Sequence, residues 1–253
     1  MTASPRRARG VRSAVTGTVC AALVALLTAC GADDPDAGTN GVGKLSAAQI
    51  EKRARQAADA AEAVRLSGTL VSDARTYRLD MRLTAEGGVG EVAAKGGTRF
   101  ELLRVREDLY LKADAEFWAH REQEGEEPSK ADREAAGKLD GKYVKVPPAD
   151  PSYAQFSAFT EMDVLLDLVL ALDGTRETGA RGEVDGVRTI RVSADGGRGG
   201  TMDVSLVGTP YPLRLQRAGD AGTVTMTNWN TEFSLRPPDE QQVVDYGKKI
   251  TED

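Results

Sequence analysis

The sequence predicts an α+β fold, in which a curled antiparallel β-sheet (a half-barrel) of about ten strands wraps around helices and is covered by them. Three observations support it. One long helical pattern comes first, several later segments alternate apolar and polar residues, and glycine-rich breaks separate these segments. Because strands joined by short glycine-containing turns run antiparallel, the strands form a meander with a charged convex face.

A helix is expected from Ala47 to Ala63. Ser46 is placed to cap its first turn, and Gln49 completes a capping box three residues later. Its inward side carries mostly alanine, with Ile50 and Val64 at the ends. Such a face is too small to form a core alone, so we expect this helix to lie across a sheet.

Strands are predicted where apolar and polar residues alternate with a period of two. In "RTYRLDMRLT" every second residue is apolar, which predicts one dry and one wet face. The same alternation returns in "GTMDVSLVG", "YPLRLQR" and "GTVTMTNW". Shorter runs predict further strands at "VRLSGTLVS", "TRFELLRV", "DLYLKA" and "KYVKVP", with turns at "EGGVGE", "KGG", "VDGV", "DGGRGG" and "GDAG".

One segment, from Asp163 to Gly174, is apolar nearly all round. It is too short to span a bilayer, so we expect a buried helix inside the concave face of the sheet. A pair of polar helices, around "DAEFWAH" and "SKADREAAGKLDG", is expected over the open side of the sheet.

The first 29 residues have the layout of a secretory signal peptide, with a basic start, an apolar run from Ala14 to Leu27 and small residues at the end. The junction Leu27-Thr28-Ala29-Cys30 resembles the bacterial lipobox. This resemblance implies that the Cys30 thiol receives a diacylglycerol, with fatty acids such as palmitate, and that the chain is then cleaved before Cys30. Ordinary secretory cleavage with Cys30 incidental is the alternative. The Arg6-Arg7 pair leaves the export route open between general secretion and the twin-arginine pathway.

Three parts are therefore expected: a signal peptide (1–29), the acylated Cys30 with a flexible tether (30–44), and a single domain (45–253). Removal of four arginines with the signal peptide changes the net charge from −6 to −10. An acidic chain is a poor partner for nucleic acid or for anionic lipid headgroups. The lipid anchor places the domain at the extracytoplasmic face of the cell membrane.

No catalytic or metal-binding pattern is found. His120 is the only histidine, and no cysteine besides Cys30 remains after cleavage, so a site of nitrogen and sulfur ligands cannot be assembled. The acidic run Glu122–Glu127 lacks the spacing of a calcium loop and is typical of a solvated segment. We expect no enzyme, no metal and no cofactor.

The order of these elements resembles a family. A lipobox, a tether, a helix ending in "VRLSGTL", the strand Leu109–Lys112, the following Trp118 and the strand Gly141–Val146 look like the actinobacterial LppX/LprG lipoproteins. This resemblance implies the half-barrel fold of the LolA and LolB carriers, with an apolar cavity for acyl chains.

These features and this resemblance are consistent with two functions. The first is a membrane-anchored carrier that holds a lipid, glycolipid or other apolar ligand in the cavity and transports or presents it at the cell envelope, without catalysis. The alternative is an envelope interaction module with a filled core that binds a partner protein. The candidate cavity residues all lie on the inner face of predicted strands or on the apolar helix: Tyr77, Leu79, Met81, Leu83, Leu166, Val169, Met202, Val204, Leu206, Leu213 and Leu215.

Overall fold

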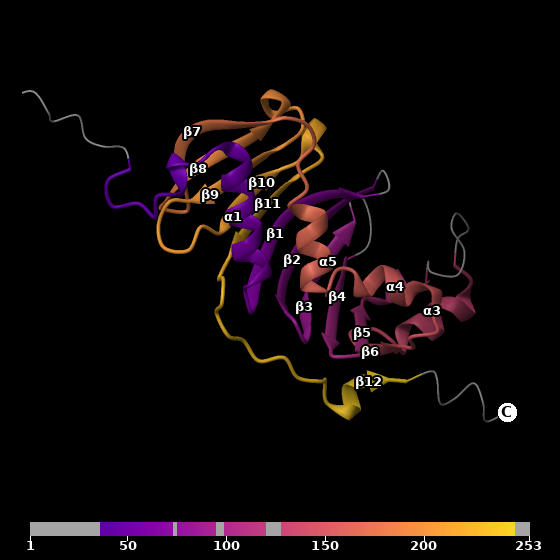
Figure 1. Ribbon diagram of the computed structural model, residues 1–253. Coiled ribbons are helices and arrows are strands. Elements are labelled where there is room, and N and C mark those ends of the chain that lie inside the picture. The colour runs from indigo at the N-terminus through magenta and orange to yellow at the C-terminus, as the bar shows by residue number, and fades with distance from the viewer. Residues whose placement is uncertain (1–35, 73–74, 95–98, 120–127, 246–253) are drawn as a thin grey trace, which may run out of the picture. The chain divides into compact units, whose positions relative to one another are not determined.

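Alternating apolar and polar residues form one open, mostly antiparallel sheet in this computed structural model (Figure 1). The structure describes residues 36–72, 75–94, 99–119 and 128–245. The signal peptide, Cys30, the "KGG" break, His120 and Glu122–Glu127 lie outside these residues. Twelve strands occur in the described part: β1 (Ala63–Ser72), β2 (Arg75–Thr84), β3 (Gly87–Ala94), β4 (Arg99–Val105), β5 (Asp108–Ala113), β6 (Tyr143–Val146), β7 (Arg176–Val184), β8 (Val187–Ala194), β9 (Thr201–Ser205), β10 (Pro212–Gln216), β11 (Thr223–Thr227) and β12 (Val243–Val244).

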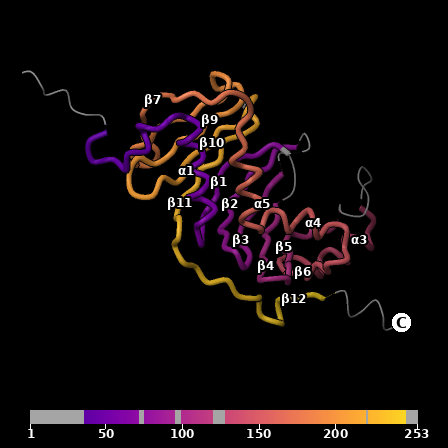
Figure 2. Tube along the Cα trace, viewed as in Figure 1, coloured from indigo at the N-terminus to yellow at the C-terminus, as the bar shows by residue number. Residues whose placement is uncertain are grey.

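The sheet consists of two meanders joined side by side. Its order is β12-β6-β5-β4-β3-β2-β1-β11-β10-β9-β8-β7, so β1 to β6 form one meander and β7 to β11 the other. They meet where β1 pairs antiparallel with β11. The short β12 adds in parallel to β6 at the end of a C-terminal segment that runs along the sheet in Figures 1 and 2. The predicted α+β half-barrel class is confirmed, with slightly more strands than expected.

Glycine allows the two meanders to approach closely. Gly68 on β1 has φ +149°, and a Cβ atom there would lie 2.1 Å from the carbonyl oxygen of Thr223. Gly222 faces Thr69 in the same way across the junction, again at 2.1 Å. A side chain at either position would collide with backbone, so this pairing requires both glycines.

The prediction of a turn over "EGGVGE" is wrong for all but Glu86, because the turn is Ala85-Glu86 and the remaining residues belong to β3. Gly88 pairs with Leu83 and Gly90 with Met81 on the neighbouring strand. A Cβ atom at residue 88 would lie 2.5 Å from a Leu83 methyl group, and one at residue 90 would lie 2.7 Å from the Met81 sulfur. These glycines therefore make room in the sheet for the larger side chains of β2.

Five α-helices accompany the sheet in the described part: α1 (Ala47–Asp59), α2 (Ala115–Ala119), α3 (Lys130–Gly137), α4 (Pro151–Ser157) and α5 (Met162–Val169). The capping box at the start of α1 is confirmed, since the Ser46 N–H donates to Gln49 Oε1 at 3.1 Å. The helix is shorter than predicted because β1 already begins at Ala63. The sequence analysis missed α4, although Asp150 caps it by accepting from the Ser152 N–H at 2.7 Å.

The expectation that the apolar helix is buried all round is wrong. One side of α5, with Leu165, Leu166 and Val169, belongs to the core. On the other side Val164 and Leu168 are each 43% exposed, beside the exposed Asp163 and Asp167. The helix covers the sheet as an outer layer, so only half of its circumference meets protein.

The folded domain begins earlier than predicted. The compact unit starts at Gly38, and Val42 is buried in the core. Asn40 binds the turn between β9 and β10, where its N–H donates to the Leu206 carbonyl at 2.9 Å and its side-chain amide donates to the Ser205 and Gly208 carbonyls at 3.0 Å each. The expected tether of residues 30–44 is therefore shorter, because residues from Gly38 onward are attached to the domain.

No helix among the described residues is both long and apolar enough to cross a bilayer.

Two substitutions on α5 test this arrangement. Leu166→Asp would place an unpaired carboxylate in the core, and we expect it to lower the free energy of unfolding by about 3–5 kcal/mol. Leu168→Asp, two residues away on the exposed side, should change it by less than about 0.5 kcal/mol. Urea unfolding of both variants measures the difference, and equal losses would mean that α5 does not lie with Leu166 inward.

Candidate functional site

The inner face of the sheet is a continuous apolar surface built by strand pairing. One row of paired positions runs across seven strands and includes Met226, Leu66, Met81, Leu102, Leu111 and Val144. A second row includes Val192, Met202, Leu215, Val224, Leu79, Val92 and Phe100. These rows cross the junction between the meanders, so both halves contribute to one apolar face.

The structure gathers most of the candidate cavity residues on this face. Nine of them belong to one core cluster and are at most 3% exposed: Leu79, Met81, Leu83, Leu166, Val169, Met202, Val204, Leu206 and Leu215. Tyr77 is half-buried beside Phe159, with ring centroids 5.7 Å apart. Leu213 is also half-buried and lies at a β-bulge, where the pairing register between β10 and β9 shifts.

Three hollows over the described residues lie mostly away from this face, although the second is lined in part by Phe100 of the second apolar row and by its pairing partner Ala113. The largest of the three, about 370 Å³, is on the polar face and is lined by Arg65, Asp80, Arg82, Val89, Gly90, Glu91 and Glu101. The others measure about 260 and 160 Å³. None of the eleven candidates lines any of these three hollows, and nine of them are packed at 3% exposure or less.

The helices cover this face in two parts. α1 lies on β7 to β10 and contributes Ile50, Ala54 and Ala58, all fully buried. The segment from α4 to α5 covers the other meander, where Arg104 of β4 donates to the Thr160 hydroxyl at 3.0 Å and Phe156 packs on Phe100. Figure 1 shows α5 in front of β2 to β4, apart from α1.

Aromatic side chains gather at one end of this covered face. Phe100 packs against Phe117 and Phe156 with ring centroids 5.6 and 5.4 Å apart, and Phe117 meets Trp118 at 5.0 Å. The rings of Phe117, Tyr77 and Phe159 are only partly buried against the core. We call this group the aromatic end; it is one place where side chains packed on the apolar core reach the surface.

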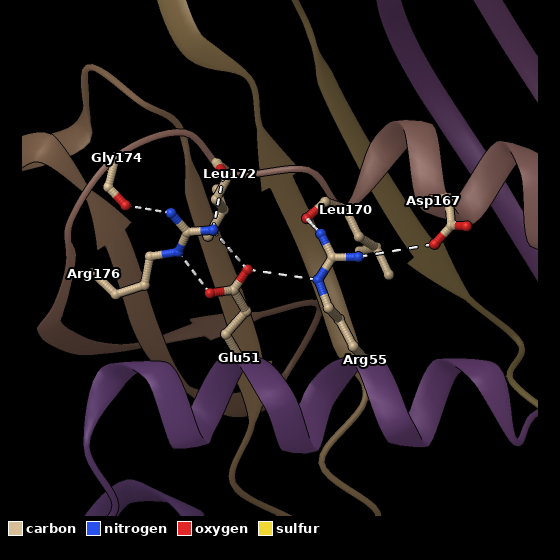
Figure 3. A network of polar contacts seen from close by, with 7 residues as sticks. All are labelled: Glu51, Arg55, Asp167, Leu170, Leu172, Gly174 and Arg176. Carbon is tan, nitrogen blue, oxygen red and sulfur yellow. Dashed lines mark hydrogen bonds and ion pairs between the residues drawn. The ribbon is translucent and has the colours of Figure 1, made fainter.

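A polar clamp ties the two helical covers together (Figure 3). Glu51 of α1 accepts from Arg176 Nε at 2.6 Å and Nη2 at 3.0 Å, and its carboxylate lies 3.5 Å from Arg55 Nε. Arg55 donates to the Leu170 carbonyl at 2.5 Å, and Arg176 donates to the Leu172 carbonyl at 2.8 Å. The clamp thus fixes the chain leaving α5 to the surface of α1.

The contact with Glu51 favours the charged state of Arg176. The hydrogen bond that Arg176 donates to Glu51 is the main cause that raises the pKa of Arg176, and burial opposes it. Glu51 itself is almost fully buried, so its carboxylate depends on these two arginines.

The polar face carries paired charges. Asp203 is bound by Arg191 at 2.8 Å and by Arg214 at 2.7 Å. Burial and a hydrogen bond to Glu101 raise the pKa of Tyr143 well above its usual range. In the described ranges no group of three or more histidine, cysteine or acidic residues is arranged to hold a metal ion.

Comparison with solved structures identifies the fold. LprF from Mycobacterium bovis matches with a TM-score of 0.52 and 17% identity, over 76% of this chain and 96% of that protein. The lipoprotein LppX from Mycobacterium tuberculosis matches with a TM-score of 0.42 and 11% identity, over 75% of this chain and 98% of LppX. The match to LprF shows that the chain has the fold of this lipoprotein, in agreement with the LppX/LprG-like fold that its sequence predicts. No sequence-family profile matches the chain, and neither does any curated protein sequence.

The clamp gives a prediction about stability. Glu51→Ala removes the shared acceptor of two partly buried arginines, and we expect a loss of about 1.5–3 kcal/mol in the free energy of unfolding. Glu134→Ala is the matched control, since the Glu134 carboxylate is exposed and its one ion pair, with Lys130 at 3.8 Å, is solvated. The free energy of unfolding of this variant should fall by less than about 0.5 kcal/mol. Urea unfolding compares the two, and a Glu51→Ala protein as stable as the control would show that the clamp adds nothing.

Proposed function

We propose that this protein is a lipid-anchored carrier at the extracytoplasmic face of the cell membrane. It holds an apolar ligand, a lipid or glycolipid, between the inner face of its sheet and the helical covers. It makes and breaks no covalent bond in this ligand, and it carries or presents the ligand within the cell envelope.

The observation that carries this proposal is the unbroken apolar face beneath a cover made of separate parts. A sheet face that spans both meanders offers more apolar surface than one helix could cover. Apolar burial contributes about 25 cal/mol per Å², so an acyl chain laid on this face gains several kcal/mol. No charged group has to be buried with the ligand.

Access to this face requires movement of the cover, because its residues are packed against one another in the closed conformation. α1 and the segment from α4 to α5 hold different meanders, and the polar clamp of Glu51, Arg55 and Arg176 joins them. Parting the covers breaks the polar contacts of the clamp, which water can replace, and exposes apolar side chains of the core. The free energy lost by that exposure is regained when the acyl chain of the ligand covers the face. The aromatic end, where Phe117 and Phe159 are partly exposed, is the natural point of entry.

A second function has one observation in its favour. The three hollows described above are not lined by the candidate residues, and the core between the sheet and helices is filled. A permanently filled core suits an interaction module that binds an envelope protein through its charged face. The experiment below distinguishes the two functions.

The carrier should retain its ligand through purification. We would express residues 31–253 with an export signal in an actinobacterial host, extract the folded protein with organic solvent, and identify the released molecules by mass spectrometry. Val204→Trp adds bulk at a fully buried position of the apolar face, so it should lower the ligand yield at least several-fold, with a stability loss of about 1–3 kcal/mol.

Gln216→Trp is the matched control, since it adds the same ring at an exposed position on the neighbouring strand and should leave the yield unchanged. Circular dichroism establishes that both variants are folded. Binding of a fluorescent fatty acid gives an independent measurement. An empty extract together with an unbound probe would reject the carrier and favour the interaction module.

The anchor is tested separately. Cys30→Ala removes the only acceptor of acyl chains at the lipobox, so incorporation of radioactive palmitate should stop and the protein should leave the membrane fraction or accumulate as its precursor. Cys20→Ala lies inside the signal peptide and should keep the label. Incorporation that persists in Cys30→Ala would show that this cysteine is not the anchor.

A further inference from the structure

The attachment of Asn40 to the β9–β10 turn limits how the domain sits on a membrane. Eight residue steps separate Cys30 from Gly38, the first residue of the folded unit. A fully extended chain of that length reaches at most about 28 Å, and a flexible glycine-containing chain averages about 16 Å. The ten residues of β1 span about 33 Å from one end of the sheet to the other. An anchor at Cys30 therefore keeps the Gly38 end of the domain near the bilayer.

The turn at this end exposes an apolar side chain. Val207 is 49% exposed and is one of three large exposed hydrophobic residues in the described part of the chain. Its backbone is fixed on both sides, because the Val207 N–H donates to Ser205 Oγ at 3.1 Å and the Ser205 hydroxyl donates to the Val207 carbonyl at 2.7 Å. Asn40 holds the next carbonyl, of Gly208, at 3.0 Å. The first attached residues of the domain thus lie directly beside Val207.

An aromatic pair lies at the base of the same turn. Tyr211 and Trp229 stack with ring centroids 4.6 Å apart and an angle of 3° between the rings, and both are half-buried. Asn230 fixes the Tyr211 hydroxyl with a hydrogen bond of 2.8 Å. Tyrosine and tryptophan are the side chains that membrane–water interfaces favour.

We infer that the β9–β10 turn, with Val207 at its surface and the Tyr211–Trp229 pair at its base, is the face that this domain lays on the lipid bilayer. One valine is too little apolar surface to bind a membrane by itself. The short chain to Cys30 supplies the missing part, because it holds the turn at a high effective concentration next to the bilayer. The inference rests on the anchor at Cys30 in the proposed function.

One consequence concerns ligand exchange. Tyr77, Phe100 and Phe117 lie at the opposite end of the strands from this turn, since β1 begins near the turn and ends near Tyr77. The aromatic end then lies away from the host membrane, at a distance of about the length of a ten-residue strand. A ligand that enters there is exchanged with a partner in the envelope rather than with the lipid directly beneath the domain.

The test attaches the protein to vesicles chemically, so that it depends neither on acylation in the cell nor on ligand binding. Residues 30–253 contain a single cysteine, Cys30. Its thiol is coupled to maleimide-bearing phosphatidylethanolamine in phosphatidylcholine vesicles, with or without brominated acyl chains that quench tryptophan. Three variants each add one tryptophan at an exposed position: Val207→Trp, Val164→Trp on α5, and Gln216→Trp at the far end of β10. The parent protein provides the background from Trp118 and Trp229.

We expect strong additional quenching for Val207→Trp and none beyond background for Gln216→Trp and Val164→Trp. Inserting twelve Gly/Ser residues after Gly31 should reduce the quenching of Val207→Trp at least twofold. Quenching that is equal at residues 207 and 216, or strongest at residue 164, would overturn the inference. Each of these results would leave the ligand extraction and palmitate labelling unaffected, so failure here is distinct from failure of the proposed function.

Discussion

The pairing of β1 with β11 is the constraint on which the rest of the structure depends. It is the one contact that turns two local meanders into a single sheet, and it exists only because Gly68 and Gly222 let the backbones approach. A wider junction would interrupt both apolar rows, since Leu66 pairs with Met226 and Gly68 with Val224. The long-range pairing therefore creates the surface that we propose as the ligand site.

The helical covers follow from that surface. An apolar face shared by two meanders has to be shielded from water, and α1 and the segment from α4 to α5 each shield one part. Where the parts meet, a carboxylate and two guanidinium groups join them, next to the buried Leu170 and Leu172. Polar contacts can exchange with water at modest cost, whereas apolar contacts cannot. A cover closed by Glu51, Arg55 and Arg176 is thus suited to opening.

The two ends of the sheet differ in chemistry. One end carries the attachment of Asn40 and the exposed Val207, and the other carries the partly exposed rings of Tyr77, Phe117 and Phe159. In our proposal the first end meets the bilayer and the second admits the ligand. The charged face between them carries ion pairs such as Arg65 to Asp80.

The sequence by itself determined the features that depend on neighbouring residues. Alternation placed Leu79, Met81, Met202 and Val204 on the inner face, and the capping box at Ser46 marked the start of α1. Three features depend on tertiary contacts and do not follow from the local pattern. The glycines of β3 pair within the sheet, and Val164 and Leu168 face water. Glu51 meets Arg176, which lies 125 residues away in the chain. A local pattern sets which residues share a side of an element. Which side meets protein, and which partner satisfies a buried charge, is fixed by segments distant in the chain, whose positions depend on the β1–β11 pairing.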